Sequence, residues 1–201
     1  MPTSALPSTN SIDLETLGAR VRACEACPEM RFSHVLGPAN GLSTARVLFV
    51  GEAPGRLGAG RSGVPFQGDE SGRRFEALLA IARLDRASVF VTNAVLCNPV
   101  DAAGNNRRPR TSDVQRCLPF LRDQLLAVDA GVIVALGEVA LSALGRIEAH
   151  GATLRSACAQ PVEWFGRVLV PLYHPGRRAL VHRSDALQQD DWRQWASIIE
   201  G

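Results

Sequence analysis

The chain contains several short apolar runs, each followed by glycine or by polar residues. Apolar runs without polar alternation are typical of strands that are covered on both faces, as in parallel sheets. They predict strands over residues 46–50, 88–93, 131–136 and 167–172. A shorter run at 162–165 predicts either a hairpin turning at Gly166 or an irregular lead-in to the fourth strand.

Apolar residues at helical spacing fill the intervals between these strands. They predict an amphipathic helix over 11–23 capped by Ser11, a helix around 75–82, a helix beginning at Thr111, a short helix after Glu138, and a last helix capped by Ser184 that turns Leu187, Trp195, Ile198 and Ile199 inward. Strands that alternate with helices predict an α/β fold. We expect a three-layer α/β/α sandwich around a mainly parallel, four-stranded sheet.

Length and composition favour one soluble domain. With 201 residues, of which 46% are hydrophobic, the chain can form one well-packed core. We expect a flexible tail at residues 1–10 and a single domain at 11–201. No run of eighteen apolar residues is present, and the N-terminus lacks the pattern of an export signal. These features predict a cytoplasmic protein without a membrane partner, and we expect it to be a monomer.

Three chemically active residues follow predicted strands. Glu52 comes after the first strand, Asn93 ends the second, and His174 follows the fourth. The carboxyl ends of parallel strands meet at one edge of a sheet, where ligands bind. Phe66 lies in a glycine-flanked loop and suits stacking on a planar ligand. An acid, an amide, an imidazole and an aromatic ring together indicate binding and release of a heterocyclic base, although each could alone be an ordinary structural residue.

Four of the five cysteines suggest a metal centre. Cys24 and Cys27 have the two-residue spacing that presents two thiolates to one centre, while Cys97 and Cys117 lie on a predicted loop and helix. Four thiolates can hold zinc or a four-iron cluster, and the spacing alone does not choose between them. Cys158, between two alanines, is expected to be a small packed side chain.

All 22 basic residues of the chain are arginine. The net charge of +2 does not by itself indicate a nucleic-acid partner, but the arginines gather in the loops at the strand ends. A basic rim there would suit a phosphate backbone, although such loops are also commonly just solvated. Because lysine is absent, no side-chain amine is available to form a Schiff base.

In this order, the motifs resemble the uracil-DNA glycosylase superfamily, and most of all its family 4, the iron-sulfur branch. The pieces are the Cys-x-x-Cys pair, Gly51-Glu52-Ala53-Pro54-Gly55, Pro65-Phe66, Thr92-Asn93 followed by Cys97, Cys117, and His174-Pro175. The resemblance implies a [4Fe-4S] cluster on Cys24, Cys27, Cys97 and Cys117. It also implies uracil stacked on Phe66 and read by Asn93, with its O2 met by His174 and by backbone amides near Glu52 and Ala53.

The chain departs from the family 4 pattern in two places. Gly58 stands where the family has a second acid that is thought to position the attacking water, and Gly176 replaces a serine that would contact phosphate. The loop 98–110 also lacks the histidine of the branch that traps DNA covalently. The resemblance therefore implies no stable protein–DNA adduct, and the group that positions the water is open.

The expected function is that of a monofunctional DNA glycosylase in base excision repair, which flips out uracil and hydrolyses its N-glycosidic bond to leave an abasic site. Glu52 and His174 are the expected catalytic residues. The expected DNA-binding residues are Arg56, Arg107, Arg108, Arg177, Arg178, Leu180 as a wedge, His182 and Arg183. Two alternatives remain: a glycosylase for hypoxanthine or xanthine, and a non-catalytic iron-sulfur module that binds DNA or senses damage.

Overall fold

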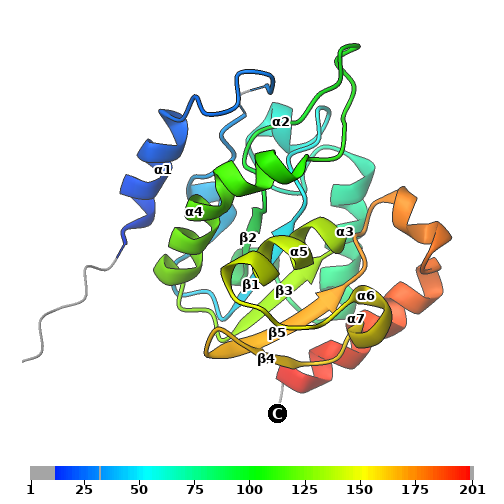
Figure 1. Cartoon of the computed structure of the whole chain (residues 1–201). Coiled ribbons are helices and arrows are strands. Elements are labelled where there is room, and N and C mark those ends of the chain that lie inside the picture. Colours follow the sequence, from blue (N-terminus) through cyan, green and yellow to red (C-terminus); the bar gives the residue numbers. More distant parts are fainter. Residues whose placement is uncertain (1–11, 32, 200–201) are drawn as a thin grey trace, which may run out of the picture.

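A mixed five-stranded sheet forms the centre of the molecule (Figure 1). The computed structural model describes residues 12–31 and 33–199, so the expected tail and the Ser11 cap lie outside it, as does the side chain of Ile199. The strands are β1 (Val47–Gly51), β2 (Phe90–Asn93), β3 (Val132–Leu136), β4 (Val162–Trp164) and β5 (Arg167–Leu172), in the order β2-β1-β3-β5-β4.

The four strands β2, β1, β3 and β5 are parallel, and only β4 runs antiparallel, against β5. This arrangement confirms the predicted α/β class, with one strand more than predicted. The extra strand corresponds to the hairpin alternative. Gly166 turns between β4 and β5 with φ of 66°, a conformation that glycine adopts without strain.

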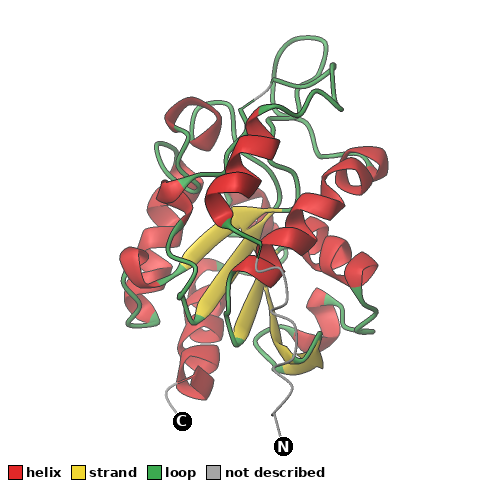
Figure 2. Ribbon diagram, turned by 90° about the vertical axis from the view of Figure 1, so that its left-hand side faces the viewer, coloured by secondary structure: helices red, strands yellow, loops and turns green. Residues whose placement is uncertain are grey.

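Helices cover both faces of the sheet, as Figure 2 shows from the side. One layer contains α1 (Leu14–Arg22), α4 (Thr111–Ala127) and α5 (Glu138–Ile147), and the other contains α3 (Glu70–Ile81) and α7 (Asp185–Ile199). Shorter helical segments lie in the connections: η1 (Pro38–Asn40), α2 (Ala59–Ser62), η2 (Arg86–Ser88), α6 (Leu154–Ala157) and η3 (Arg177–Val181).

The alternation of side chains along β1 shows why its apolar run is continuous. Leu48 and Val50 belong to the core on the α1, α4 and α5 side, whereas Val47 and Phe49 belong to the core on the α3 and α7 side. Phe49 stacks on Trp192 with ring centroids 5.6 Å apart. Both faces of the strand are buried, so neither face can be polar without a loss of hydrophobic stabilisation.

The helix termini show where the sequence pattern was misleading. Asp13 caps α1, accepting a bond from Thr16 N–H at 2.8 Å, so the predicted helix start at residue 11 was too early. Ser184 does cap α7, through the N–H of Leu187 at 3.4 Å.

The prediction that Leu187 and Ile198 turn inward was wrong, since they are 44% and 39% exposed. Trp192, Trp195 and Ala196 form the buried face of α7 instead.

Within the described residues, none of the helices has the length and apolar character needed to cross a membrane.

Candidate active site

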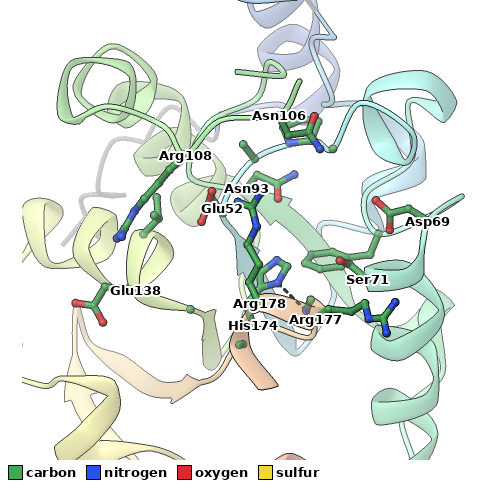
Figure 3. Close-up of a pocket in the computed structure, with 18 of the residues that line it drawn as sticks. Glu52, Asp69, Ser71, Asn93, Asn106, Arg108, Glu138, His174, Arg177 and Arg178 are labelled. Carbon is green, nitrogen blue, oxygen red and sulfur yellow. Dashed lines mark hydrogen bonds between the residues drawn. The ribbon is translucent and has the colours of Figure 1, made fainter. Parts of the chain in front are cut away.

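The carboxyl ends of β1, β2 and β5 open into one cleft with a volume of about 1090 Å³. Glu52, Asn93 and His174 all line it (Figure 3). Phe66, from the loop before α3, lines it as well. The convergence predicted from the positions of these residues after parallel strands is therefore confirmed.

Gly51, the last residue of β1, lies where the two expected base-binding groups meet. A Cβ on Gly51 would lie 2.5 Å from Asn93 Oδ1 and 2.9 Å from the ring of Phe66. Both distances are shorter than real Cβ contacts, so only glycine fits between the amide and the ring. Asn93 is 3% exposed and is Gly51's register partner on β2. An amide and an aromatic ring thus meet at the floor of the cleft.

The ring of Phe66 is held by its neighbours in an unusual backbone conformation. Phe66 has φ of 54°, which is uncommon for a residue other than glycine. Its ring stacks on Phe75 at 4.6 Å between centroids and lies at a tilt to His174 at 5.6 Å. Gly72 in the first turn of α3 has no room for a Cβ, because the Phe66 carbonyl occupies that position. The packing of α3 therefore fixes the place of the ring.

His174 is a neutral imidazole whose tautomer is set by the backbone. Its Nδ1 accepts the N–H of Gly176 at 2.9 Å, so the ring proton resides on Nε2. Burial lowers the pKa of His174 from 6.5 to about 4, and the nearby Asp69 only partly opposes this shift. At neutral pH the ring can thus donate one hydrogen bond from Nε2 without carrying a positive charge.

Glu52 is a half-buried carboxylate facing two arginines. Burial raises its pKa above the ordinary value of 4.5, and the positive charges of Arg108 and Arg178 oppose that rise. The backbone carbonyl of Glu52 accepts the N–H of Val95 at 3.1 Å, which fixes the loop against the end of β2. The protonation state of Glu52 therefore depends on two opposing influences, burial and the two nearby arginines.

Asp69 is a second acid in the cleft that the sequence pattern did not reveal. It caps α3 through Oδ1, which accepts Gly72 N–H at 2.9 Å, while Oδ2 faces the loop after β1. A Cβ on Gly58 would overlap Asp69 Oδ2, and a Cβ on Gly55 would lie 3.0 Å from it. The Asp69 carboxylate thus lies beside the backbone position where the resemblance leads one to expect an acid. From sequence alone it is only a helix cap.

Asn106 is another cleft residue that sequence reasoning missed. Its Oδ1 accepts Arg56 N–H at 2.9 Å and Asn98 Nδ2–H at 3.1 Å. Asn98 in turn donates to the carbonyl of Pro54 at 2.7 Å. Two amides of the loop 98–110 therefore hold the loop that follows Glu52. The loop's polar, glycine-containing composition gave no sign of this contact.

The arginine rim is present at the mouth of the cleft. Arg56, Arg108, Arg177 and Arg178 are exposed and line it, together with His182. Arg177 lies 3.5 Å from a carboxylate oxygen of Glu70 with 77% of its side chain exposed, so this pair leaves it accessible. Arg155 on α6 is also exposed and lines the cleft, an addition to the predicted set.

Three of the residues expected to bind DNA have surroundings that differ from an exposed rim. Arg107 is an internal side chain, ion-paired with Asp113 at 2.7 Å and only 15% exposed. Arg183 makes a two-pronged ion pair with Asp191 that joins η3 to α7. Leu180 is half-buried, whereas the adjacent Val181 is 82% exposed. Arg107 and Arg183 therefore each have an acidic partner within the fold, and Val181 is more exposed than Leu180.

The four cysteines of the expected metal centre lie within electrostatic reach of one another. Cys24 and Cys27 both contribute to raising the pKa of Cys97 and Cys117, although burial is the larger cause. The pKa of Cys117 reaches about 12, and its Sγ accepts the N–H of Leu96 at 3.4 Å. Among the described residues, no three His, Cys, Asp or Glu side chains are arranged to hold a single metal ion.

Comparisons with known proteins bear directly on this geometry. The family model of the uracil DNA glycosylase superfamily matches residues 38–196. This chain belongs to that superfamily. A Thermotoga maritima protein named type-4 uracil-DNA glycosylase is 34% identical over 179 residues, covering 88% of each chain. A Pyrobaculum aerophilum protein of the same name is 32% identical over 200 residues, covering 94% of this chain and 95% of that protein.

Similarity extends to a second type within the superfamily. A Thermus thermophilus protein named type-5 uracil-DNA glycosylase is 30% identical over 202 residues, covering 83% of this chain and 89% of its own. The resemblance inferred from the motifs is thus confirmed at the level of the superfamily and of the type-4 relatives.

Proposed function

We propose that this protein is a monofunctional uracil-DNA glycosylase that hydrolyses the bond between uracil N1 and deoxyribose C1′ and leaves an abasic site. The observation that carries the proposal is that the Asn93 amide and the Phe66 ring meet at Gly51 and both line the cleft, which places a hydrogen-bonding group and an aromatic face where a planar base could bind. The superfamily assignment and the names of the relatives support it.

Base recognition rests on Asn93. Uracil presents an N3–H donor and an O4 acceptor, and one side-chain amide can match both at once, whereas cytosine reverses the pattern. The bond to be broken is inaccessible inside stacked DNA, so the nucleotide must first rotate out of the helix. Phe66, braced by Phe75, then offers a face on which the extruded base can stack.

Cleavage needs stabilisation of charge on both sides of the breaking bond. Uracil leaves as an anion with charge on O2, and the neutral His174 can donate its Nε2–H to that oxygen. The sugar becomes a cation, and the Glu52 carboxylate at the strand end can offset that charge. The anion then takes up a proton, and water adds to C1′.

We assign the positioning of that water to Asp69. Its Oδ1 is engaged in capping α3, Oδ2 lies against Gly55 and Gly58, and the residue lines the cleft. Gly58 lacks a side chain, and the space beside it is taken by this carboxylate. Asp69 thus supplies, from α3, the acid that the resemblance places at residue 58.

DNA would be held by the rim of Arg56, Arg108, Arg155, Arg177 and Arg178 through phosphate contacts. Val181, exposed in η3 beside these arginines, is our candidate for the apolar wedge that fills the emptied stack. Because the chain contains no lysine, we expect no strand scission through a Schiff base after the glycosidic step.

Cys24, Cys27, Cys97 and Cys117 would hold a [4Fe-4S] cluster. Such a cluster takes four thiolate ligands, and the electrostatic influence of Cys24 and Cys27 on Cys97 and Cys117 supports placing all four at one centre. When bound, it would tie the segment after α1 to the loop and helix that flank Asn93, a structural contribution.

The test is cleavage of oligonucleotides that contain a single uracil, hypoxanthine or xanthine, followed by alkali to reveal abasic sites. We expect a uracil-dependent product that is cut only after alkali treatment. Cleavage of hypoxanthine or xanthine in place of uracil would transfer the proposal to the other deaminated bases. If none of the three bases is released, the remaining candidate is a non-catalytic DNA-binding function.

A further inference from the structure

A buried ion pair connects the cysteine site to the loop that lines the cleft. Asp113, in the first turn of α4, has a side chain that is 0% exposed. Its Oδ2 accepts hydrogen bonds from Arg107 Nη1 at 2.7 Å and from the backbone N–H of Arg110 at 2.8 Å. Its Oδ1 lies 3.9 Å from Arg116 Nη1. The Asp113 carboxylate therefore interacts with Arg107 in the loop 98–110 and with Arg116 on α4.

On one side, Arg107 spans the loop 98–110. Its Nε donates to the carbonyl of Val100 at 3.0 Å, and its Nη1 donates to the carbonyl of Arg108 at 3.2 Å. The same loop presents Asn106 and Arg108 to the cleft. The position of these two residues therefore depends on a guanidinium that is itself held by Asp113.

On the other side, Arg116 reaches the cysteine site. Its Nη1 pairs with Glu29 at 3.0 Å and lies 3.9 Å from Cys27 Sγ. Arg116 is one turn along α4 from Asp113, so the helix holds the two side chains in register. The contacts form a continuous path from Cys27 through Arg116, Asp113 and Arg107 to the cleft loop.

We propose that Asp113 is a positioning residue, which fixes the loop 98–110 through Arg107 so that Asn106 and Arg108 face the DNA, and ties that loop to the cysteine site through Arg116. The inference deepens the proposed glycosylase function and rests on it for the role of Arg108. A buried carboxylate is costly unless it is paired, and the partners that pair it here, Arg107 and the Arg110 N–H, both belong to the loop 98–110.

The first test is amide hydrogen exchange. Asp113→Asn keeps the size of the side chain but cannot hold Arg107 by charge, so exchange of the amides in the loop 98–110 should accelerate about tenfold or more. Asp123→Asn, which removes a carboxylate from a surface pair on the same helix, is the control and should leave that loop unchanged. Equal exchange in the two variants would overturn the proposal.

The second test is a mutant cycle on DNA affinity, measured by anisotropy with undamaged duplex. Arg108→Ala should weaken binding several-fold in the native background but add almost nothing in Asp113→Asn, because the side chain is already misplaced. Arg155→Ala, on α6, should cost the same in both backgrounds. Full additivity of Arg108→Ala and Asp113→Asn would contradict positioning.

If Asp113→Asn does not fold, the pair can be replaced by Arg107→Met with Asp113→Leu, since apolar replacement of a buried ion pair is often tolerated. The same exchange and affinity outcomes then decide the proposal. The exchange measurement uses the protein alone and the affinity measurement uses DNA without uracil, so both remain decisive even if the native protein excises no base. That separate failure would refute the proposed activity alone.

Discussion

The donor on His174 gives the sharpest prediction. Its Nδ1 is occupied by the Gly176 N–H, and its pKa of about 4 means that roughly one ring in a thousand is protonated at pH 7. Any help to the departing uracil must therefore come from the neutral Nε2–H. One well-placed donor to a developing oxyanion contributes about 3 to 4 kcal/mol, so His174→Ala should slow the chemical step about a hundred- to a thousandfold.

The assay is single-turnover cleavage of a uracil oligonucleotide with the protein in excess, alongside DNA affinity, which should change little. His182→Ala, at the cleft rim, is the matched control and should retain the native rate. The native rate should also stay level as pH rises through 6.5, because the ring has already lost its charge near pH 4. Two results would refute the reasoning. One is a rate that falls between pH 6 and 8 as the His174 imidazolium loses its proton. The other is a His174→Ala variant that is as fast as the native protein.

Three further predictions concern the cleft, its rim and the cysteine site. Glu52→Gln should reduce the single-turnover rate about a hundredfold. Because burial raises the Glu52 pKa above 4.5, native activity should fall as pH drops through that raised value, and this limb should vanish from the variant's pH profile. Arg178→Ala should weaken DNA binding and lower the salt slope by about 0.9, while Arg183→Ala, internally paired, should leave the slope unchanged. Protein purified without air should absorb broadly at about 400 nm. Cys117→Ala should lose iron and stability, while Cys158→Ala should retain the iron; one zinc per chain would contradict this assignment.

The sequence was informative where local pattern and burial coincide. The runs that became β1, β2, β3 and β5 are apolar because both faces of each strand are covered, so their positions could be predicted. The convergence of Glu52, Asn93 and His174 followed from strand direction alone. The hairpin at Gly166 remained one of two alternatives because short apolar runs do not specify their partners.

The sequence was misleading where long-range packing decides which side chains are buried and what they contact. On α7, Leu187 and Ile198 share the helical period with buried residues, yet Trp192 faces the core because Phe49 and Phe75 stand opposite it. Asp69 reads as a helix cap, and only the approach of α3 to the loop after β1 places its second oxygen beside Gly58. Arg107 looked like a surface charge because its partner, Asp113, was hidden in a helix start.

The hairpin between β4 and β5 is a suitable site for attaching a tag or a fluorophore. Since β5 runs parallel to its neighbours, the turn at Gly166 lies at the edge of the sheet opposite the cleft. Gly166 is exposed, and a Cβ built there meets nothing within 4 Å. A short tag or a fluorophore inserted at this turn would project away from bound DNA. The protein could then be immobilised on a surface, or followed on single DNA molecules, with its catalytic edge facing solution.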